Sequence, residues 1–386
     1  MTQNKNGLAP PQFIDDQNSY ESVIPELMKE KILAVDTEAN SLFAYREQVC
    51  LIQISSPRKD YILDPIRIKD ISSLGELFRD PNIEKVFHAS EYDFLILNEE
   101  YQFEFQNLFD TMLAAQILGR TKLGLDALLE EMVGITANKK YQRADWGKRP
   151  LSEDMLRYAQ MDTHYLIKIR DELSAELEKT GLIPIAREDF TRACLVHKVV
   201  REKKDDPCWR INGARNLPPQ QAAVLVKLFQ YRDQVARKRN QPVFKIMSSK
   251  ALLMLAEECP VNIKQLIKLD LPGKKAVERH ADNLIKAIQA GLNSNPVYPP
   301  KRARANDSYQ IREKAIRDWR KSAAQKMNVN SAVVLPRDLL YAVVSANPSN
   351  KKGLAEVLEN VPWRLERFGD DILSVLLQSN QSGRKG

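Results

Sequence analysis

The chain has 386 residues, of which 43% are hydrophobic and 28% are charged, and its net charge is +7. This length and composition predict two or three globular domains with separate cores. No apolar run approaches the ~20 residues that cross a bilayer, and the polar N-terminal residues lack the features of a secretory signal, so we expect a cytoplasmic protein with no membrane segment. The four cysteines are scattered and form no C-x-x-C pair, which argues against a zinc site and a disulfide framework.

The first half of the sequence alternates between strand-like and helix-like segments. Four short apolar runs predict strands, at 32–35, 49–54, 61–63 and 86–88. Four segments have the apolar spacing of amphipathic helices, at 71–79, 91–100, 111–133 and 152–178. This alternation predicts an α/β fold.

The second half contains no convincing strand, and its strongest feature is an internal repeat with a period of 88 residues. The match joins 231–288 to 319–376 without a gap. Its identical pairs include Arg232 with Arg320, Asn240 with Asn328 and Asn262 with Asn350. Two copies of one small all-helical domain are therefore predicted.

A basic, proline-containing segment, NSNPVYPPKRARAN, separates the two copies and predicts a semi-extended linker. The sequence thus predicts four parts, which are an α/β domain at 1–205, a first helical domain at 206–292, the linker at 293–306 and a second, divergent helical domain at 307–380.

The two halves of the chain carry opposite charge. Residues 1–200 contain 24 Lys and Arg against 33 Asp and Glu, a net charge of −9, whereas residues 201–386 contain 34 against 18, a net charge of +16. A basic half of this kind favours a nucleic-acid partner, and a merely solvated surface is the alternative.

Four acidic residues at the ends of predicted elements form a candidate catalytic set. Asp36 and Glu38 end the first predicted strand, where residues i and i+2 project from the same face. Asp93 lies early in the helix that follows the fourth strand, and Asp162 lies four positions beyond Tyr158, on the same face of one helix. An isolated D-x-E pair is more typical of a polar strand end, so the prediction depends on all these residues together.

Four carboxylates gathered in one place repel one another unless cations neutralise them. All-oxygen ligation suits Mg²⁺ or Mn²⁺ rather than zinc. Two such ions, about 4 Å apart, can activate a water molecule on one side of a phosphodiester and stabilise the leaving 3′-oxygen on the other. A phenol with an ordinary pKa of about 10 is suited to orienting that water rather than to acting as a free base, and this is the role expected of Tyr158.

Three stretches resemble the exonuclease motifs of the DEDDy nucleases in order and spacing, namely ILAVDTE, HASEYDFLIL and YAQMDTHYL. The third has the Tyr-x-x-x-Asp form that distinguishes this branch from relatives with a histidine there, and the preceding RPLSEDML resembles the lead-in of ribonuclease D. Both repeats resemble HRDC domains. The order exonuclease, HRDC, HRDC is similar to that of bacterial ribonuclease D.

The resemblance implies an RNase H-like fold and 3′-5′ exoribonuclease activity that releases 5′-mononucleotides. It implies two Mg²⁺ or Mn²⁺ ions as cofactors and RNA with a free 3′ end, such as tRNA precursors, as the partner. It also assigns the site residues, with Tyr158 positioning the water and the metal ligands being Asp36, Glu38, Asp93 and Asp162.

The first repeat carries a mixture of basic and aromatic residues that could bind phosphates and stack a base. They are Tyr231, Arg232, Arg237, Lys238, Phe244 and Lys245. In the second repeat Ala332 and Val333 replace Phe244 and Lys245, which removes a ring and a charge. A solvated helix face is the alternative interpretation.

Two other functions compete with this one. A DNA 3′-5′ exonuclease would use the same carboxylates, although no G-x-x-x-x-G-K-[ST] loop is present and a helicase motor is therefore excluded on this chain. A non-catalytic RNA-binding protein would not need them, so the intact carboxylates and Tyr158 argue against it.

Overall fold

The computed structural model describes residues 8–195, 207–300 and 307–382. The chain divides into two compact units. The first combines residues 1–39 and 49–199 with 304–386, and the second combines residues 40–48 with 200–303. The predicted boundary at 205 and residues 301–306 of the predicted linker lie outside the described residues.

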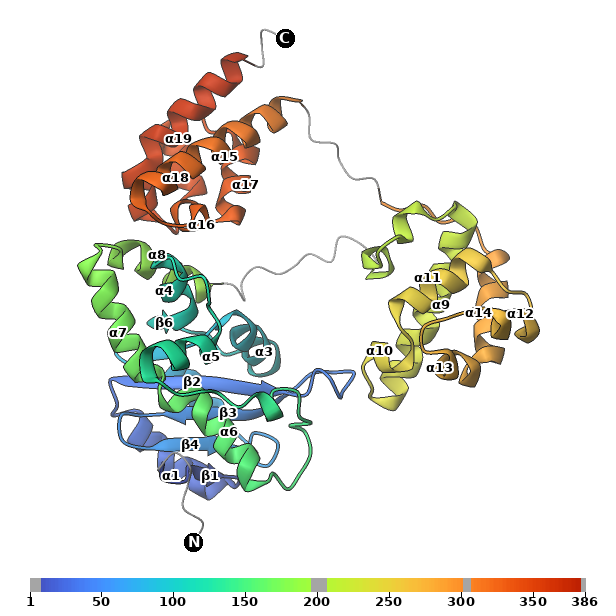
Figure 1. The fold of residues 1–386 in the computed structure, drawn as a ribbon, viewed down its shortest axis with the longest axis horizontal. Coiled ribbons are helices and arrows are strands. Elements are labelled where there is room, and N and C mark those ends of the chain that lie inside the picture. Colours follow the sequence, from blue (N-terminus) through green and yellow to red (C-terminus); the bar gives the residue numbers. More distant parts are fainter. Residues whose placement is uncertain (1–7, 196–206, 301–306, 383–386) are drawn as a thin grey trace. The chain divides into compact units, whose positions relative to one another are not determined.

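A six-stranded sheet forms the centre of the first unit (Figure 1). Its strands lie in the order β1 (Gln12–Ile14), β4 (Asp60–Leu63), β3 (Val49–Ser55), β2 (Ile32–Ala39), β5 (Glu84–Phe87) and β6 (Leu108–Asp110). β3 is antiparallel to both of its neighbours, and the other pairs are parallel. Every residue of β3 is buried, which explains why its sequence is nearly continuously apolar rather than alternating.

Helices pack around this sheet; one or more lie between most strands, except that β2, β3 and β4 follow one another directly and all helices from α4 onward follow β6. They are α1 (Gln17–Leu27), α2 (Ser72–Arg79), α3 (Glu91–Tyr101), α4 (Thr111–Ile117), α5 (Leu125–Leu128), α6 (Glu153–His164), α7 (Leu166–Lys179) and α8 (Ile183–Ala193). The predicted α/β fold class is confirmed. Two predicted helices are divided, one between α4 and α5 and one at Tyr165 between α6 and α7, and the three-residue strands β1 and β6 had no detectable sequence signal.

Both repeats are all-helical, as predicted, and their helices correspond, except that the single helix α19 of the second repeat takes the place of α13 and α14 in the first. In the first the helices are α9 (Pro219–Arg239), α10 (Val243–Ile246), α11 (Ser249–Glu258), α12 (Ile263–Lys268), α13 (Lys274–Arg279) and α14 (Ala281–Leu292). In the second they are α15 (Asp307–Met327), α16 (Ser331–Val334), α17 (Arg337–Ala346), α18 (Lys351–Val357) and α19 (Pro362–Ser382).

Equivalent asparagines explain why both repeats fold alike. Asn240 and Asn328 follow the long first helix of each copy with φ angles of 45° and 54°, a conformation that asparagine tolerates at a helix end. Asn262 and Asn350 cap α12 and α18 through their side chains.

Within the described parts of the chain, no helix is both long and apolar enough to span a membrane.

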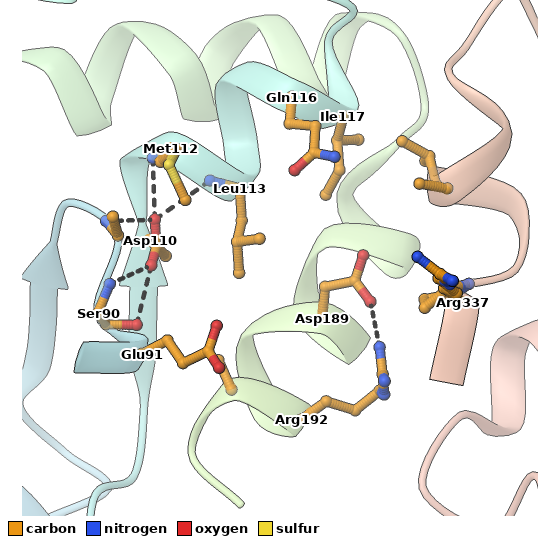
Figure 2. Close-up of a pocket in the computed structure, with 15 residues that line it drawn as sticks. Ser90, Glu91, Asp110, Met112, Leu113, Gln116, Ile117, Asp189, Arg192 and Arg337 are labelled. Atoms are coloured by element: carbon orange, nitrogen blue, oxygen red, sulfur yellow. Dashed lines mark hydrogen bonds and ion pairs between the residues drawn. The ribbon is translucent and has the colours of Figure 1, made fainter. Parts of the chain in front are cut away.

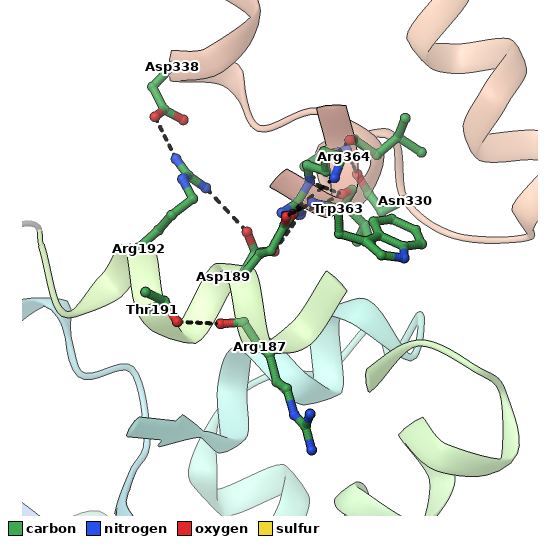
Figure 3. A network of polar contacts seen from close by, with 12 residues as sticks. Arg187, Asp189, Thr191, Arg192, Asn330, Asp338, Trp363 and Arg364 are labelled. Atoms are coloured by element: carbon green, nitrogen blue, oxygen red, sulfur yellow. Dashed lines mark hydrogen bonds and ion pairs between the residues drawn. The ribbon is translucent and has the colours of Figure 1, made fainter. Parts of the chain in front are cut away.

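The second repeat belongs to the same compact unit as the sheet because it packs against α8 (Figure 3). Arg364 is fully buried and bonds the carboxylates of Glu188, at 3.0 Å, and Asp189, at 2.9 Å. Arg192 reaches Asp338 at 2.6 Å. Val333 is 2% exposed and belongs to the hydrophobic core of the α/β domain.

Candidate active site

β2 presents two carboxylates on one face of the sheet. Its first half is held in the core by buried apolar residues, and Asp36 and Glu38 follow near its C-terminal end. In the antiparallel pair with β3, Asp36 lies opposite Gln53 and Glu38 lies opposite Leu51. A register shift directly after Glu38 ends the regular pairing, so both acids lie at the edge of the ordered sheet.

α6 brings the third motif to that face. Ser152 caps the helix by accepting a hydrogen bond from the backbone N–H of Met155. The hydroxyls of Thr163 and of Ser55 on β3 are 2.7 Å apart, which fixes the helix against the sheet. Tyr158 and Asp162 are half-buried on this helix, one turn apart.

Asp93 lies in the first turn of α3 and is buried. The hydroxyl of Thr37, the residue between the two acids of β2, donates a hydrogen bond to its carboxylate. This bond ties the second motif to the first.

Asp110 holds the turn that precedes α3, a role that the sequence did not reveal. Its carboxylate accepts from the backbone N–H groups of Ala89 and Ser90 and from the Ser90 hydroxyl, and it also caps α4 through Met112 and Leu113 (Figure 2). Ala89 has a φ of 62°, an uncommon conformation for alanine that these bonds stabilise. The sequence signal for this role is the position of Asp110 at the end of β6, the strand beside β5.

Burial and mutual repulsion dominate the electrostatics of the site. Burial, followed by the charges of Asp93, Asp162 and Glu38, raises the pKa of Asp36 well above its ordinary value. Burial also raises the pKa of Glu38 to about 9 and that of Asp93 and of Asp162 to about 7. The structure thus brings together all four predicted acids, and no basic side chain contributes to these shifts.

Tyr158 completes the group. Burial, then the charges of Asp162, Glu38 and Asp36, raises the pKa of its phenol far above the ordinary value. Its ring lies 6.0 Å from that of Trp146 and 6.1 Å from that of Tyr141. The phenol therefore stays protonated at neutral pH and can donate a hydrogen bond.

The donor set fits divalent cations that prefer oxygen. Four carboxylates converge without a cationic side chain, and a bound cation would relieve the repulsion that raises their pKa values. Among the described residues, no three His, Cys, Asp or Glu side chains form a ready metal-binding group, and Asp93 is instead bonded by Thr37. The residues fit a metal by chemistry and position, and their side chains would have to turn toward it.

The six residues predicted to bind RNA occupy different environments in the second unit. Arg237, Lys238, Phe244 and Lys245 are exposed. Arg232 is 4% exposed and donates to the Met247 carbonyl and the Ser249 hydroxyl, and the half-buried Tyr231 has its hydroxyl 2.6 Å from a ring nitrogen of His280. Arg232 and Tyr231 therefore hold the repeat together rather than face solvent.

Two family models match the chain. The 3′-5′ exonuclease domain matches residues 11–178, and the HRDC domain matches residues 221–288 and again 312–376. Both catalytic motifs on β2 and α6 fall inside the first match.

Individual relatives agree with these models. Protein RRP6-like 2 of Arabidopsis thaliana is 31% identical over 73% of this chain and 34% of its own length, and the exosome complex exonuclease RRP6 of Saccharomyces cerevisiae is 30% identical over 74% and 41%. The chain thus spans between a third and a half of the length of such curated relatives.

Solved structures extend the similarity over almost the whole chain. RNase D of Escherichia coli superposes with a TM-score of 0.70 at 26% identity, covering 96% of this chain and 99% of that one. The catalytic core of RRP6 from Trypanosoma brucei superposes with a TM-score of 0.63 at 27% identity, covering 74% and 80%. The chain therefore has a DEDD-type 3′-5′ exonuclease domain followed by two HRDC domains, and over these domains it is similar to RNase D and to RRP6.

Proposed function

We propose that this protein is a cytoplasmic 3′-5′ exoribonuclease that trims the 3′ ends of structured RNA precursors, such as those of tRNA, and releases 5′-mononucleotides. The observation that carries the proposal is the convergence of four carboxylates from β2, α3 and α6 beside a protonated phenol. RNA as the substrate is supported by E. coli RNase D, which is described as an exoribonuclease involved in structured RNA processing.

Two divalent cations, Mg²⁺ or Mn²⁺, would be held by Asp36, Glu38, Asp93 and Asp162. When bound, they would activate water and stabilise the leaving oxygen. Tyr158 would donate its phenolic hydrogen bond and orient the attacking water, since its raised pKa prevents it from acting as a base near neutral pH. Asp110 would act indirectly, by holding the turn that positions Asp93.

A pocket of about 250 Å³ opens beside the third motif and suits the 3′-terminal nucleotide. Tyr158 and Asp162 line one side, and Asn138, Lys140 and Arg157 line another. The two basic side chains would attract a phosphate next to an otherwise acidic cluster.

The exposed residues of the first repeat would hold the body of the RNA. Phe244 is 53% exposed, so its ring is accessible for stacking on a base, and Lys238 and Lys245 are exposed nearby in sequence. We therefore restrict the proposed RNA surface to Arg237, Lys238, Phe244 and Lys245.

Digestion of matched RNA and DNA oligonucleotides tests this function. Each substrate is labelled at the 5′ end and carries a free or a blocked 3′ end, and each is incubated with Mn²⁺ or with a chelator. We expect a ladder that shortens only from free 3′ ends of RNA, only with metal, and Asp162→Asn should abolish it while retaining RNA binding.

The other outcomes identify the alternatives. Faster digestion of DNA would favour a DNA exonuclease, and RNA binding without cleavage in Mn²⁺ would favour a non-catalytic RNA-binding protein. Cleavage of a circular RNA would contradict an exonuclease of either kind.

A further inference from the structure

We propose that Gln53 is a positioning residue of the active site, whose side-chain amide donates a hydrogen bond to the Asp36 carboxylate and orients it toward a bound divalent cation. The inference rests on the proposed function, because it concerns the metal-binding form of the same site.

Gln53 is an anomaly in the core. It lies in the middle of β3, the strand whose residues are all buried, and its own exposure is 0%. Neither its amide nitrogen nor its amide oxygen has a hydrogen-bond partner among the described residues. A buried unpartnered amide destabilises a folded protein, and an apolar residue at this position would avoid that penalty, so the amide calls for a functional explanation.

The register of the sheet shows what Gln53 faces. It lies directly opposite Asp36 in the antiparallel pair, so the two side chains project from the same face with β-carbons about 5 Å apart. Ser55, two residues further along β3, also projects from this face and contacts Thr163, the neighbour of Asp162 on α6. Gln53 therefore lies beneath α6, between the strand that carries Asp36 and the helix that carries Asp162.

This location explains the missing partner. Among the described residues the acidic side chains do not form a ready metal-binding group, so the Asp36 carboxylate does not have the orientation that it would take toward a cation. Turning one of its oxygens toward a cation would leave the other to accept from the amide of Gln53. Outer residues that bond a metal ligand in this way typically strengthen metal binding or activity by about 10- to 100-fold.

The test replaces Gln53 by methionine, which keeps an unbranched side chain of similar length and removes the amide. In the full-length protein, Mn²⁺ affinity is measured by calorimetry and thermal unfolding is recorded with and without Mn²⁺. We expect Gln53→Met to weaken Mn²⁺ binding by about 10- to 100-fold, while the metal-free protein melts no lower than the parent. Turnover of RNA should fall without a change in RNA affinity. If Gln53→Met does not fold, Gln53→Leu serves in its place.

Gln160→Leu is the matched control, because Gln160 is also a buried amide but bonds the Ala9 carbonyl and the Asp60 carboxylate. It should lower metal-free stability and leave Mn²⁺ affinity unchanged. Asp36→Asn separates this inference from the proposed function. Parental Mn²⁺ affinity in Gln53→Met, together with weakened binding in Asp36→Asn, would show that Gln53 is only structural. Parental affinity in both variants would overturn the metal site itself.

Discussion

The two helical repeats share one sequence pattern, but the same position has different surroundings in each. Phe244 and Lys245 of the first repeat are exposed, whereas their counterparts 88 residues later, Ala332 and Val333, line the contact with the exonuclease domain. Figure 2 shows this contact, where a cavity of about 290 Å³ lies between α4, α8 and the second repeat. The position is therefore exposed in one copy, where Lys245 also lies over the ring of Phe43, and is part of an internal interface in the other.

The anchor of this interface is specific to the second repeat. Arg364 donates to two carboxylates of α8 and to the carbonyls of Val333 and Val334 (Figure 3). The backbone N–H of Trp363 donates to Glu188 at 2.5 Å. The first repeat has Lys275 and Ala276 at the equivalent positions and cannot make these bonds. One copy is thus part of the same compact unit as the sheet, whereas the exposed basic residues of the other copy form the proposed RNA surface.

Removing the buried side chain of Arg364 should have the largest effect on the free energy of unfolding. Arg364→Ala leaves the carboxylates of Glu188 and Asp189 without their buried partner, and breaking a buried ion pair from one side costs about 3–5 kcal/mol. We expect an earlier urea unfolding midpoint for the exonuclease domain. Lys351→Ala, which removes the exposed ion pair with Asp370, is the control and should cost less than about 1 kcal/mol. Unfolding of Arg364→Ala at the parental midpoint would mean that the second repeat is not anchored in solution.

Metal binding should stabilise the second repeat together with the exonuclease domain. The four tryptophans report separately on the parts, since Trp146 lies in the exonuclease domain, Trp209 next to the first repeat, and Trp319 and Trp363 in the second. In a fluorotryptophan-labelled protein followed by fluorine NMR, diamagnetic Mg²⁺ at 100 times its Kd should add about 2.7 kcal/mol of stability. The signals of Trp146, Trp319 and Trp363 should shift to higher melting temperatures together, and that of Trp209 should not. Melting of the second repeat together with Trp209 would show that this repeat does not unfold as one unit with the exonuclease domain.

The stability of the exonuclease domain without metal should also depend on pH. The folded protein holds protons on Asp93 and Asp162 up to a pH of about 7, whereas the unfolded chain releases them near the ordinary value of 3.8. Because the folded state binds more protons in this window, stability of the metal-free exonuclease domain should fall as pH rises from about 4 to 7. Asp162→Asn should flatten this fall, measured by thermal unfolding, and should melt no lower than the parent at pH 8. An equally steep fall in the variant would contradict the shifted carboxylate.

The sequence could predict which of these side chains share a face because local geometry determines their positions. Two residues along a strand and four along a helix fix which side chains share a face, so the pairs Asp36 with Glu38 and Tyr158 with Asp162 could be inferred without tertiary information. The burial of Arg232 could not be inferred from the sequence. Within a run of basic residues, nothing distinguishes a buried guanidinium that donates to a distant carbonyl from a solvated one.

Residues whose partners lie far away in the sequence were missed for the same reason. Asp110 bonds Ser90, and Arg364 bonds Glu188, which is 176 residues earlier. The importance of Gln53 depends on strand register, which is set only when β2 and β3 pair. Long-range pairing thus determines the supporting residues, whereas the chemical groups themselves lie in short local motifs.

Two substitutions at neighbouring positions of the repeat pattern should separate the roles of the repeats. Phe244→Ala should weaken binding of single-stranded RNA by about 1–3 kcal/mol, the contribution of one stacked base, without changing the melting temperature. Val333→Ala, one position beyond the equivalent site, should cost about 1–3 kcal/mol of stability through the cavity it leaves and should not change RNA affinity. Fluorescence anisotropy and thermal unfolding measure the two effects. Equal loss of RNA affinity in both variants would mean that the second repeat binds RNA despite its buried surface.

The smallest expected effect is a change in the salt dependence of RNA binding, and it compares the two copies directly. Lys238 and Lys326 occupy equivalent positions near the ends of α9 and α15, and both are exposed. For single-stranded RNA the slope of log affinity against log salt changes by about 0.7 for each phosphate contact. Lys238→Ala should therefore reduce the magnitude of the slope by about 0.7, whereas Lys326→Ala should leave it unchanged, because removing a charge that touches no phosphate releases no counterion. Both variants keep the helix and its core, so a difference between them reports on RNA contact rather than on folding. Equal changes would show that both repeats bind the backbone, and no change in either would place the RNA on the exonuclease domain alone.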